Sequence, residues 1–363
     1  MKNRKIKIDY IIPTLDKGGA ERFFVDLLKY LDRDKFEPRL VLYKKGGDWL
    51  QEIKDLNIDY IILEKKNKVS LKNFCFLYKT IKKRKPDIVH TQLGGDIYGV
   101  LAAKLSGVKK IITTEVNTNQ DEKLIYNLIK RISLRFVTMV VAVSLAVASD
   151  ARKRYNLRSE KVIVIYNGID LSRFLLSPQK NLLEFSKRKS FVFGSIGRLS
   201  EQKGYTYLIE AMSKIKNSRI KLKIAGDGYL RESLEKEIEK YNLKGRVSLL
   251  GHVNTPDFLK SIDAFVLPSI WEGMGIVLVE AALAGVPIIA TKVGGIVEVV
   301  NKDSAILVEA KNSSKLAKEM INLRDNINTL EIAAKIERAS KEVKEKFDIN
   351  KIAKKYQELY NNL

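Results

Sequence analysis

The sequence predicts an α/β protein built from two doubly wound, Rossmann-like domains of similar size. Short apolar runs alternate along the whole chain with amphipathic helical stretches, the pattern of parallel strands joined by crossover helices. A polar, lysine-rich stretch interrupts this alternation once, and the pattern then restarts. The 363 residues are enough for two domains that each bury a hydrophobic core.

The first predicted domain covers residues 1–175. Its strand candidates are residues 7–13, 38–43, 59–63, 87–91, 110–114, 139–143 and 161–165. The helix predicted at residues 20–31 has an apolar face made of Phe23, Phe24, Leu27, Leu28 and Leu31. Asp9 and Pro13 interrupt the first apolar run, which favours a buried strand over a secretion signal.

Residues 176–189 are predicted to be a linker, and the second domain follows at residues 190–347. Its strand candidates are residues 191–196, 221–225, 247–249, 264–267, 287–290 and 305–308. Residues 348–363 are predicted as a helix that packs back on the first domain, with an apolar stripe of Ile352, Tyr356, Leu359 and Tyr360. We expect the domains to face each other across a cleft, with ligands at the carboxyl ends of the strands.

The composition indicates a protein that is soluble or lies on a membrane, but does not span one. The longest apolar stretch, residues 137–148, is shorter than the ~20 residues that cross a bilayer. Cys75 is the only cysteine, which fits a reducing, cytoplasmic location. Residues 1–190 carry 39 Lys and Arg against 21 Asp and Glu, or +18 of the net +23. This predicts a basic face for an acidic partner, with a lysine-rich genome as the alternative.

Two loops that follow predicted strands are candidate anion sites. Gly18 and Gly19 precede a helix, where backbone N–H groups suit a phosphate or a sugar hydroxyl, although an ordinary tight turn would look the same. Gly197 is followed by Arg198 and Lys203, two cations that would hold a diphosphate and neutralise charge on a leaving group. Solvated surface cations are the alternative for this second pair.

A third motif, residues 268–280, brings two carboxylates to the end of another strand. Glu280 lies within an apolar helical segment, where burying a carboxylate is costly without a partner. Glu272 precedes that helix, with a helix-capping role as the alternative. The paired hydroxyls of a ribose would suit one of the two carboxylates, and the hydroxyls of a sugar would suit the other. Further on, the backbone of Gly294 and Gly295 is placed to reach a phosphate.

His90 closes the strand at residues 87–91, and we weigh a role at the cleft against a structural one. No His, Cys or carboxylate cluster in the sequence has the spacing of a metal site. The sequence also suggests no Ser-His-Asp or Cys-His catalytic arrangement.

Taken in order, these motifs closely resemble the large family-four group of retaining glycosyltransferases with the GT-B fold. The markers are Gly18-Gly19-Ala20-Glu21, Asp87-Ile88-Val89-His90, Tyr166-Asn167-Gly168-Ile169-Asp170 with Phe174, Gly197-Arg198-Leu199 with Lys203-Gly204, Gly226-Asp227-Gly228, and Glu272 with Glu280 and Glu298. Two positions depart from the pattern, because Gln92 and Glu115 stand where many members have histidines. Both departures lie toward the sugar or acceptor and leave the diphosphate site unaffected.

The resemblance implies a role for each matching residue. Arg198 and Lys203 would hold the donor diphosphate in place of a metal, so no cofactor is expected. Glu280 would bind the ribose, and Glu272 would contact the donor sugar. The Met274, Gly275 and Ile276 backbone would lie near that sugar, and Gly197 would belong to the same donor site. Gly18 and Gly19 would close over the phosphates, and His90 would lie near the reacting sugar.

The function implied is transfer of a hexose or N-acetylhexosamine from a nucleotide-diphosphate sugar to a saccharide or lipid-linked saccharide acceptor, in cell-surface polysaccharide synthesis. A UDP-sugar is the leading donor and GDP-mannose the alternative. An epimerase of the same fold and a polyanion-binding protein are weaker readings, and nucleic acid is not an expected partner. The segment at residues 121–136 is either a helix lying on an anionic membrane at the inner face of the cytoplasmic membrane or a core-packed helix with a solvated face.

Overall fold

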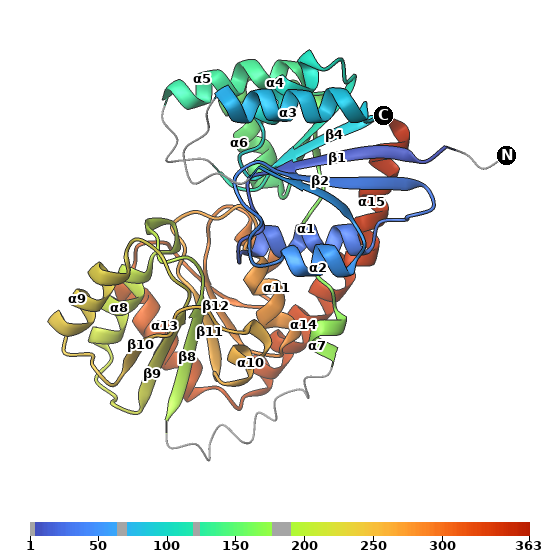
Figure 1. Ribbon diagram of the computed structural model, residues 1–363. Coiled ribbons are helices and arrows are strands. Elements are labelled where there is room, and N and C mark those ends of the chain that lie inside the picture. The colour runs from blue at the N-terminus through green and yellow to red at the C-terminus, as the bar shows by residue number, and fades with distance from the viewer. Residues whose placement is uncertain (1–3, 64–70, 119–123, 176–189) are drawn as a thin grey trace. The chain divides into compact units, whose positions relative to one another are not determined.

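The computed structural model describes residues 4–63, 71–118, 124–175 and 190–363, and it divides into two compact units (Figure 1). Unit 1 comprises Met1–Ile169 and Ile349–Leu363, and unit 2 comprises Asp170–Asp348. Residues 170–175, which the sequence prediction gave to the first domain, therefore belong to unit 2. The predicted linker at residues 176–189 lies outside the described residues.

Unit 1 is built on a seven-stranded parallel sheet with the order β3-β2-β1-β4-β5-β6-β7. The strands are β1 (Ile6–Ile12), β2 (Phe36–Leu42), β3 (Asp59–Ile62), β4 (Ile88–Gln92), β5 (Lys110–Glu115), β6 (Met139–Ala142) and β7 (Val162–Val164). From β1 the strand order continues to β2 and β3 on one side, and from β4 it continues to β5, β6 and β7 on the other side. The switch point of the sheet therefore lies between β1 and β4.

The helices of unit 1 connect successive strands. They are α1 (Gly19–Lys29), α2 (Leu50–Asp55), α3 (Leu71–Arg84), α4 (Tyr98–Leu105), α5 (Leu124–Ser133), the 3-10 turns η1 (Leu134–Phe136) and η2 (Ser159–Lys161), and α6 (Leu145–Tyr155). Asp9, which interrupts the apolar run of β1, is fully buried and forms ion pairs with Arg39 and Arg84. A buried carboxylate is tolerated there because two guanidinium groups neutralise it.

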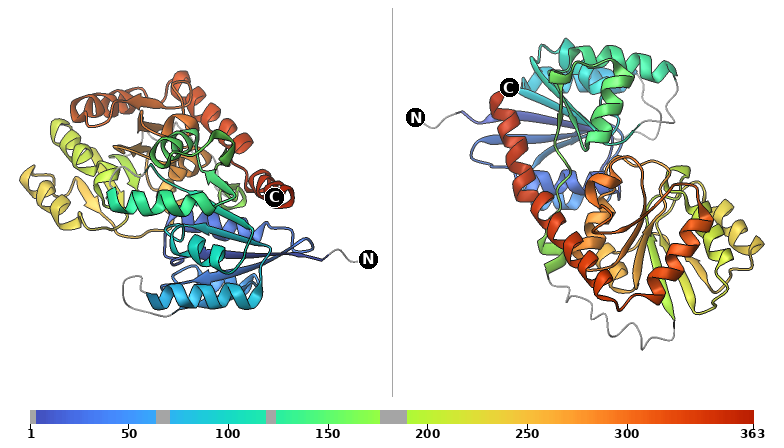
Figure 2. Two further views of the ribbon diagram at one scale, coloured as in Figure 1. Left: turned by 90° about the horizontal axis from the view of Figure 1, so that it is seen from above. Right: turned by 180° about the vertical axis from the view of Figure 1, so that it is seen from behind.

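The C-terminal helix α15 (Ile349–Asn362) completes the core of unit 1, and it lies beside the strands of this unit in Figures 1 and 2. Ile352, Tyr356 and Tyr360 are fully buried and share one hydrophobic cluster with side chains of α1 and β1. The helix thus returns to the unit that contains the N-terminus.

Unit 2 is a six-stranded parallel sheet with the order β10-β9-β8-β11-β12-β13. The strands are β8 (Phe191–Ile196), β9 (Ile220–Ala225), β10 (Val247–Leu249), β11 (Ala264–Leu267), β12 (Ile288–Thr291) and β13 (Ile306–Val308). The helices are α7 (Ser172–Leu175), α8 (Tyr205–Lys214), α9 (Arg231–Lys240), α10 (Thr255–Lys260), α11 (Ile276–Leu283), α12 (Ile296–Val299), α13 (Ser313–Asp325) and α14 (Leu330–Lys346), with the 3-10 turn η4 (Glu201–Lys203).

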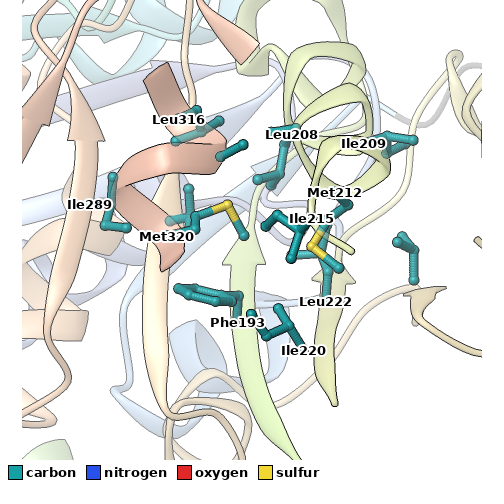
Figure 3. Close-up of a cluster of buried hydrophobic side chains, with 14 of the residues drawn as sticks. Phe193, Leu208, Ile209, Met212, Ile215, Ile220, Leu222, Ile289, Leu316 and Met320 are labelled. Carbon is teal, nitrogen blue, oxygen red and sulfur yellow. The ribbon is translucent and has the colours of Figure 1, made fainter. Parts of the chain in front are cut away.

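The core of unit 2 forms where α8 and α13 cover the sheet (Figure 3). Leu208 and Met212 from α8 and Met320 from α13 pack over Phe193 and Leu222 of the strands, and all five are almost completely buried. The switch point of this sheet lies between β8 and β11, so the loops that follow those two strands are the natural place for a ligand.

The predicted fold class is confirmed. Each predicted strand corresponds to an observed strand whose ends differ by no more than two residues. Within the part of the chain that the structure describes, no helix combines the length and the apolar character needed to cross a membrane.

Candidate functional site

Two glycine-containing loops meet at the switch point of unit 2, after β8 and after β11. The Ile270 backbone N–H donates to the Gln202 carbonyl at 2.7 Å and joins the loops directly. Gly204 has a φ of +63°, and a Cβ there would lie 2.2 Å from the Pro268 carbonyl oxygen. Only glycine fits this close approach, which explains why the loop after β8 carries one at this position.

Lys203 and Glu272 form an ion pair across these loops, with Nζ and Oε2 2.6 Å apart. Their side chains are 14% and 10% exposed, so both charges are largely removed from water. The Ser269 hydroxyl donates to the same carboxylate oxygen at 3.0 Å. An ammonium carries three N–H donors, and the carboxylate occupies one of them, which leaves capacity for a second anionic group.

The backbone of Glu272 is fixed by the paired glycines that follow β12. The Gly295 N–H donates to the Glu272 carbonyl at 3.0 Å. A Cβ on Gly294 would lie 2.1 Å from that same carbonyl oxygen, and one on Gly295 would lie 2.0 Å from the Gly273 oxygen. The sequence predicts that the backbone of these glycines contacts a phosphate. In the structure they support the loop that carries Glu272.

Gly197 and Arg198 complete the loop after β8. A Cβ on Gly197 would lie 3.0 Å from Cε of Lys203, so the lysine stem runs directly over this glycine. Arg198 is exposed, and it has no ion-pair partner among the residues that the structure describes. The loop therefore presents one neutralised cation and one available cation.

The helix α11 starts at the same edge of the sheet. Its N-cap is Gly275, with a φ of +77°, and no side chain caps the helix. Glu272 is therefore not the N-cap residue, and that alternative is wrong. Met274 is buried, Ile276 is partly buried, and both flank the start of the helix.

Glu280 lies in the middle of α11 and is partly exposed, whereas its neighbours Val279 and Ala281 are fully buried. The carboxylate is therefore only partly buried, less than the sequence indicated. The more buried carboxylate of the pair is Glu272, at 8% exposure. Both nevertheless belong to the segment between β11 and the end of α11.

In unit 1, Gly18 and Gly19 lie where the first strand passes into α1. Gly18 is the N-cap and offers no side chain to the free N–H groups of the helix. Gly19 is exposed, and a Cβ on Gly18 would lie 2.2 Å from Oε2 of Glu21. The carboxylate of Glu21 thus lies close to the helix terminus that the sequence assigned to an anion.

His90 is in the core of unit 1, where it is 1% exposed. Nδ1 lies 2.8 Å from the Tyr360 hydroxyl, and Nε2 lies 2.7 Å from Oγ1 of Thr114. The Tyr360 hydroxyl also lies 3.1 Å from the Tyr10 hydroxyl, so the histidine belongs to a buried hydrogen-bond network. Burial lowers the pKa of His90 from 6.5 to about 3. Both ring nitrogens are occupied, so the structure favours the structural role for this histidine.

A buried charge cluster at the carboxyl edge of the unit 1 sheet is absent from the sequence predictions. Lys130 of α5 forms ion pairs with Asp96 at 2.7 Å and with Glu115 at 2.8 Å. The coulombic attraction of the two carboxylates outweighs burial and raises the pKa of Lys130 well above its usual range. The glycines of Gly94-Gly95-Asp96 mark a turn after β4 in the sequence, which is a signal for the position of Asp96. No sequence signal distinguishes Lys130 from the many surface lysines of this protein.

In the ranges 4–63, 71–118, 124–175 and 190–363, no three His, Cys, Asp or Glu side chains form a group suited to a metal ion.

Comparison with known proteins places this site in a family. Residues 17–173 match the model of Glycosyltransferase Family 4, and residues 180–343 match that of Glycosyl transferases group 1. A UDP-Gal:alpha-D-GlcNAc-diphosphoundecaprenol alpha-1,3-galactosyltransferase of Escherichia coli is 30% identical over 98% of this chain and 97% of its own length. The chain belongs to the family-4 glycosyltransferases.

A more distant relative agrees with this assignment, and a solved structure supports the fold. An N-acetylgalactosamine-N,N'-diacetylbacillosaminyl-diphospho-undecaprenol 4-alpha-N-acetylgalactosaminyltransferase of Campylobacter jejuni is 26% identical over 85% of this chain and 88% of its own length. The crystal structure of Anabaena Alr3699/HepE with UDP and glucose has a TM-score of 0.86 at 23% identity, covering 99% of this glycosyltransferase and 100% of that chain. At that identity the structure supports the GT-B fold, which the two parallel sheets of this glycosyltransferase have.

Proposed function

We propose that this glycosyltransferase moves a hexose or N-acetylhexosamine from a UDP-sugar to a lipid-diphosphate-linked saccharide during synthesis of a cell-surface polysaccharide, with retention of anomeric configuration. The observation that carries this proposal is the Lys203–Glu272 pair at the switch point of the unit 2 sheet, on a loop that also carries Arg198, a cation with no ion-pair partner among the described residues. A pair of cations with one carboxylate nearby suits a ligand that combines a diphosphate with sugar hydroxyls.

Each residue of this site has a role in the proposal. Arg198 and the remaining N–H donors of Lys203 bind the donor phosphates, and the open N-terminus of α11 adds backbone N–H groups and a partial positive charge. Glu272 accepts from the hydroxyls of the donor sugar. Glu280, which is partly exposed, accepts from the ribose hydroxyls. Gly18 and Gly19 of unit 1 are proposed to contact the phosphates.

The proposed reaction is a displacement on the sugar face that carried the leaving group. The bond from C1 to the acceptor hydroxyl oxygen forms while the bond from C1 to the diphosphate oxygen breaks. The acceptor proton passes to the departing diphosphate, so the products are the glycosylated acceptor and the nucleoside diphosphate. Arg198 and Lys203 stabilise the negative charge that develops on the diphosphate, which is the role that a divalent cation fills in other nucleotide-sugar enzymes. We therefore propose catalysis without a metal cofactor.

The acceptor assignment is supported by the relatives from Escherichia coli and Campylobacter jejuni, whose names specify diphosphoundecaprenol-linked substrates. The net charge of residues 1–190, +18, adds an electrostatic argument, because a diphosphate-linked lipid and an anionic bilayer both carry negative charge. We propose that the enzyme acts in the cytoplasm, at the inner face of the cytoplasmic membrane, as a peripheral protein.

Calorimetric titration with UDP and with GDP tests the donor. Saturable binding of UDP with much weaker binding of GDP is expected, and the reverse order would favour the GDP-mannose alternative. Nuclear magnetic resonance of the product formed from an α-linked UDP-sugar tests the stereochemistry. An α-linked product supports retention, and a β-linked product would overturn it.

Substitutions test the site itself. Lys203→Ala and Glu280→Ala are each expected to reduce turnover by about 100-fold or more, the scale seen when a group that stabilises the transition state is removed. Lys214→Ala is a matched control, because Lys214 also pairs with a glutamate, Glu210, but at the far end of α8. Near-normal turnover in both site variants, with folding intact by circular dichroism, would exclude the proposed site.

A further inference from the structure

Helix α5 and the adjoining turn η1 expose a row of large apolar side chains. Leu124 and Ile125 are 87% and 74% exposed. The other members of this apolar face are Leu128, Ile129, Ile132 and Phe136, each at least 40% exposed. Their spacing, in steps that follow the helical repeat, puts them on one side of α5. A soluble helix normally turns such a face toward the core, so this exposure needs a cause.

The cause is visible on the inner side of α5, which is polar. Lys130 and Ser133 are the buried residues of this helix. Lys130 reaches Asp96 and Glu115, and the Ser133 hydroxyl donates to the Lys130 carbonyl at 2.9 Å, with the Asp96 carbonyl 3.4 Å away. Buried ion pairs of this kind fix the rotation of the helix, because turning the apolar side inward would leave the two carboxylates unpaired. Helix α5 is thus amphipathic with its apolar face held outward.

The rim of the apolar face is basic. Residues 124–137 contain Lys130, Arg131 and Arg135 and no Asp or Glu. Since Lys130 is turned inward, Arg131 and Arg135 remain as the cations of this rim, and Arg135 is exposed. The ammonium of Lys104, from the end of α4, lies 5.9 Å from the Phe136 ring, and the adjacent Leu105 is 66% exposed. The apolar face is therefore bordered by positive charge.

We propose that this face of α5 and η1 inserts into the surface of an anionic lipid bilayer and holds the enzyme there. This inference rests on the proposed function, because an enzyme with a lipid-linked acceptor must meet that acceptor at a membrane surface. It assigns the contact with the membrane to helix α5 and the adjoining turn η1. Ten residues of helix rise ~15 Å, too short to span the ~30 Å hydrocarbon core, so α5 lies in the interface. A second copy is disfavoured as the occupant, because symmetric pairing would bring the basic rims together.

Vesicle flotation of the full-length protein is the first test. Vesicles of phosphatidylglycerol and phosphatidylethanolamine in equal parts are compared with vesicles of phosphatidylcholine alone. Strong binding to the anionic vesicles and weak binding to the neutral ones are expected. No binding to either would overturn the proposal, and equal binding to both would refute the role of the basic rim.

Matched leucines provide the decisive variants. Leu124 and Leu330 are the first residues of α5 and α14, and they are 87% and 89% exposed. Leu124→Ser is expected to weaken binding to anionic vesicles several-fold, and Leu330→Ser to leave it unchanged. The triple variant Ile125→Ser/Leu128→Ser/Ile132→Ser is expected to lose at least tenfold, with unchanged circular dichroism. Wild-type binding by the triple variant would overturn the proposal.

Two further measurements separate this inference from its alternatives. Sedimentation equilibrium tests for dimers, and a dimer that the triple variant abolishes, without vesicle binding by the wild type, would assign the face to self-association and refute the proposal. UDP titration tests the proposed function separately, and the triple variant is expected to bind UDP like the wild type. Failure of UDP binding with intact vesicle binding would count against the donor assignment alone.

Discussion

Replacing His90 by glutamine distinguishes a structural histidine from a catalytic one through the pH dependence of stability. The folded protein holds the neutral ring, with a pKa of about 3 against 6.5 in the unfolded chain. Below pH 6.5 the unfolded state binds a proton that the folded state does not, so the free energy of unfolding falls as the pH is lowered. The loss is about 1.4 kcal/mol per pH unit, or ~2 kcal/mol between pH 6.5 and about pH 5. A glutamine at this position does not titrate, so the variant lacks this pH dependence of stability.

The assay is urea unfolding at a series of pH values, followed by tryptophan fluorescence. The chain has two tryptophans, Trp49 in unit 1 and Trp271 in unit 2. With Trp271→Phe as the common background, Trp49 reports the unit that contains His90. At neutral pH, His90→Gln is expected to cost about 1–3 kcal/mol, because Tyr360 and Thr114 lose well-placed buried partners.

Toward acid pH the wild type is expected to lose about 2 kcal/mol more than the variant, so the two curves converge. Parallel curves would refute the buried, neutral histidine. A variant that keeps wild-type stability at every pH but loses turnover by orders of magnitude would restore His90 to the catalytic residues.

Three further substitutions probe the loops and the buried charges. Lys130→Met leaves two buried carboxylates without their cation and is expected to cost about 3–5 kcal/mol, measured by urea unfolding; a loss below 1 kcal/mol would contradict the buried pairs. Gly295→Ala places a Cβ 2.0 Å from the Gly273 oxygen, and a loss of about 1–3 kcal/mol with reduced turnover is expected from the displaced loop. An active, equally stable variant would show that the loop tolerates the shift. Glu272→Gln removes the charge that neutralises Lys203, so UDP is expected to bind up to roughly fivefold more tightly, about 1 kcal/mol, while transfer falls. Weaker UDP binding, by calorimetry, would instead mean that Glu272 positions the lysine.

The fold followed from the sequence because hydrophobic periodicity is a local property. Each strand of the two sheets is a short apolar run between turn signals, so its position needed no knowledge of the rest of the chain. The terminal helix was similarly marked by its stripe of Ile352, Tyr356 and Tyr360, all fully buried. The motif glycines were also informative, because Gly204 and Gly275 have the positive φ that a turn after a strand requires.

The burial of single polar residues could not be predicted from the sequence, because it depends on which face of a helix or strand the fold turns toward the core. Glu280 lies in an apolar segment, yet it is only partly buried, whereas Glu272 in a glycine-rich turn is buried. Lys130 lies among basic residues, yet it points into unit 1. The sequence predicts His90 at the end of a strand, where ligand residues gather, but it lies in the middle of β4, and Tyr360, the partner of its Nδ1, comes from α15, 270 residues later.

Charge balance explains why only one of the two buried lysine clusters is suited to an anionic ligand. At the edge of the unit 1 sheet, Lys130 is 5% exposed and already faces two carboxylates, so its positive charge is more than neutralised. At the edge of the unit 2 sheet, Lys203 is 14% exposed and pairs with one carboxylate, and the exposed Arg198 lies on the same loop. The first cluster therefore fixes a helix, and the second keeps the remaining N–H donors of Lys203 and the exposed guanidinium of Arg198 at the carboxyl ends of parallel strands. A diphosphate would accept from these donors, which is the physical basis for the proposal that the donor binds in unit 2.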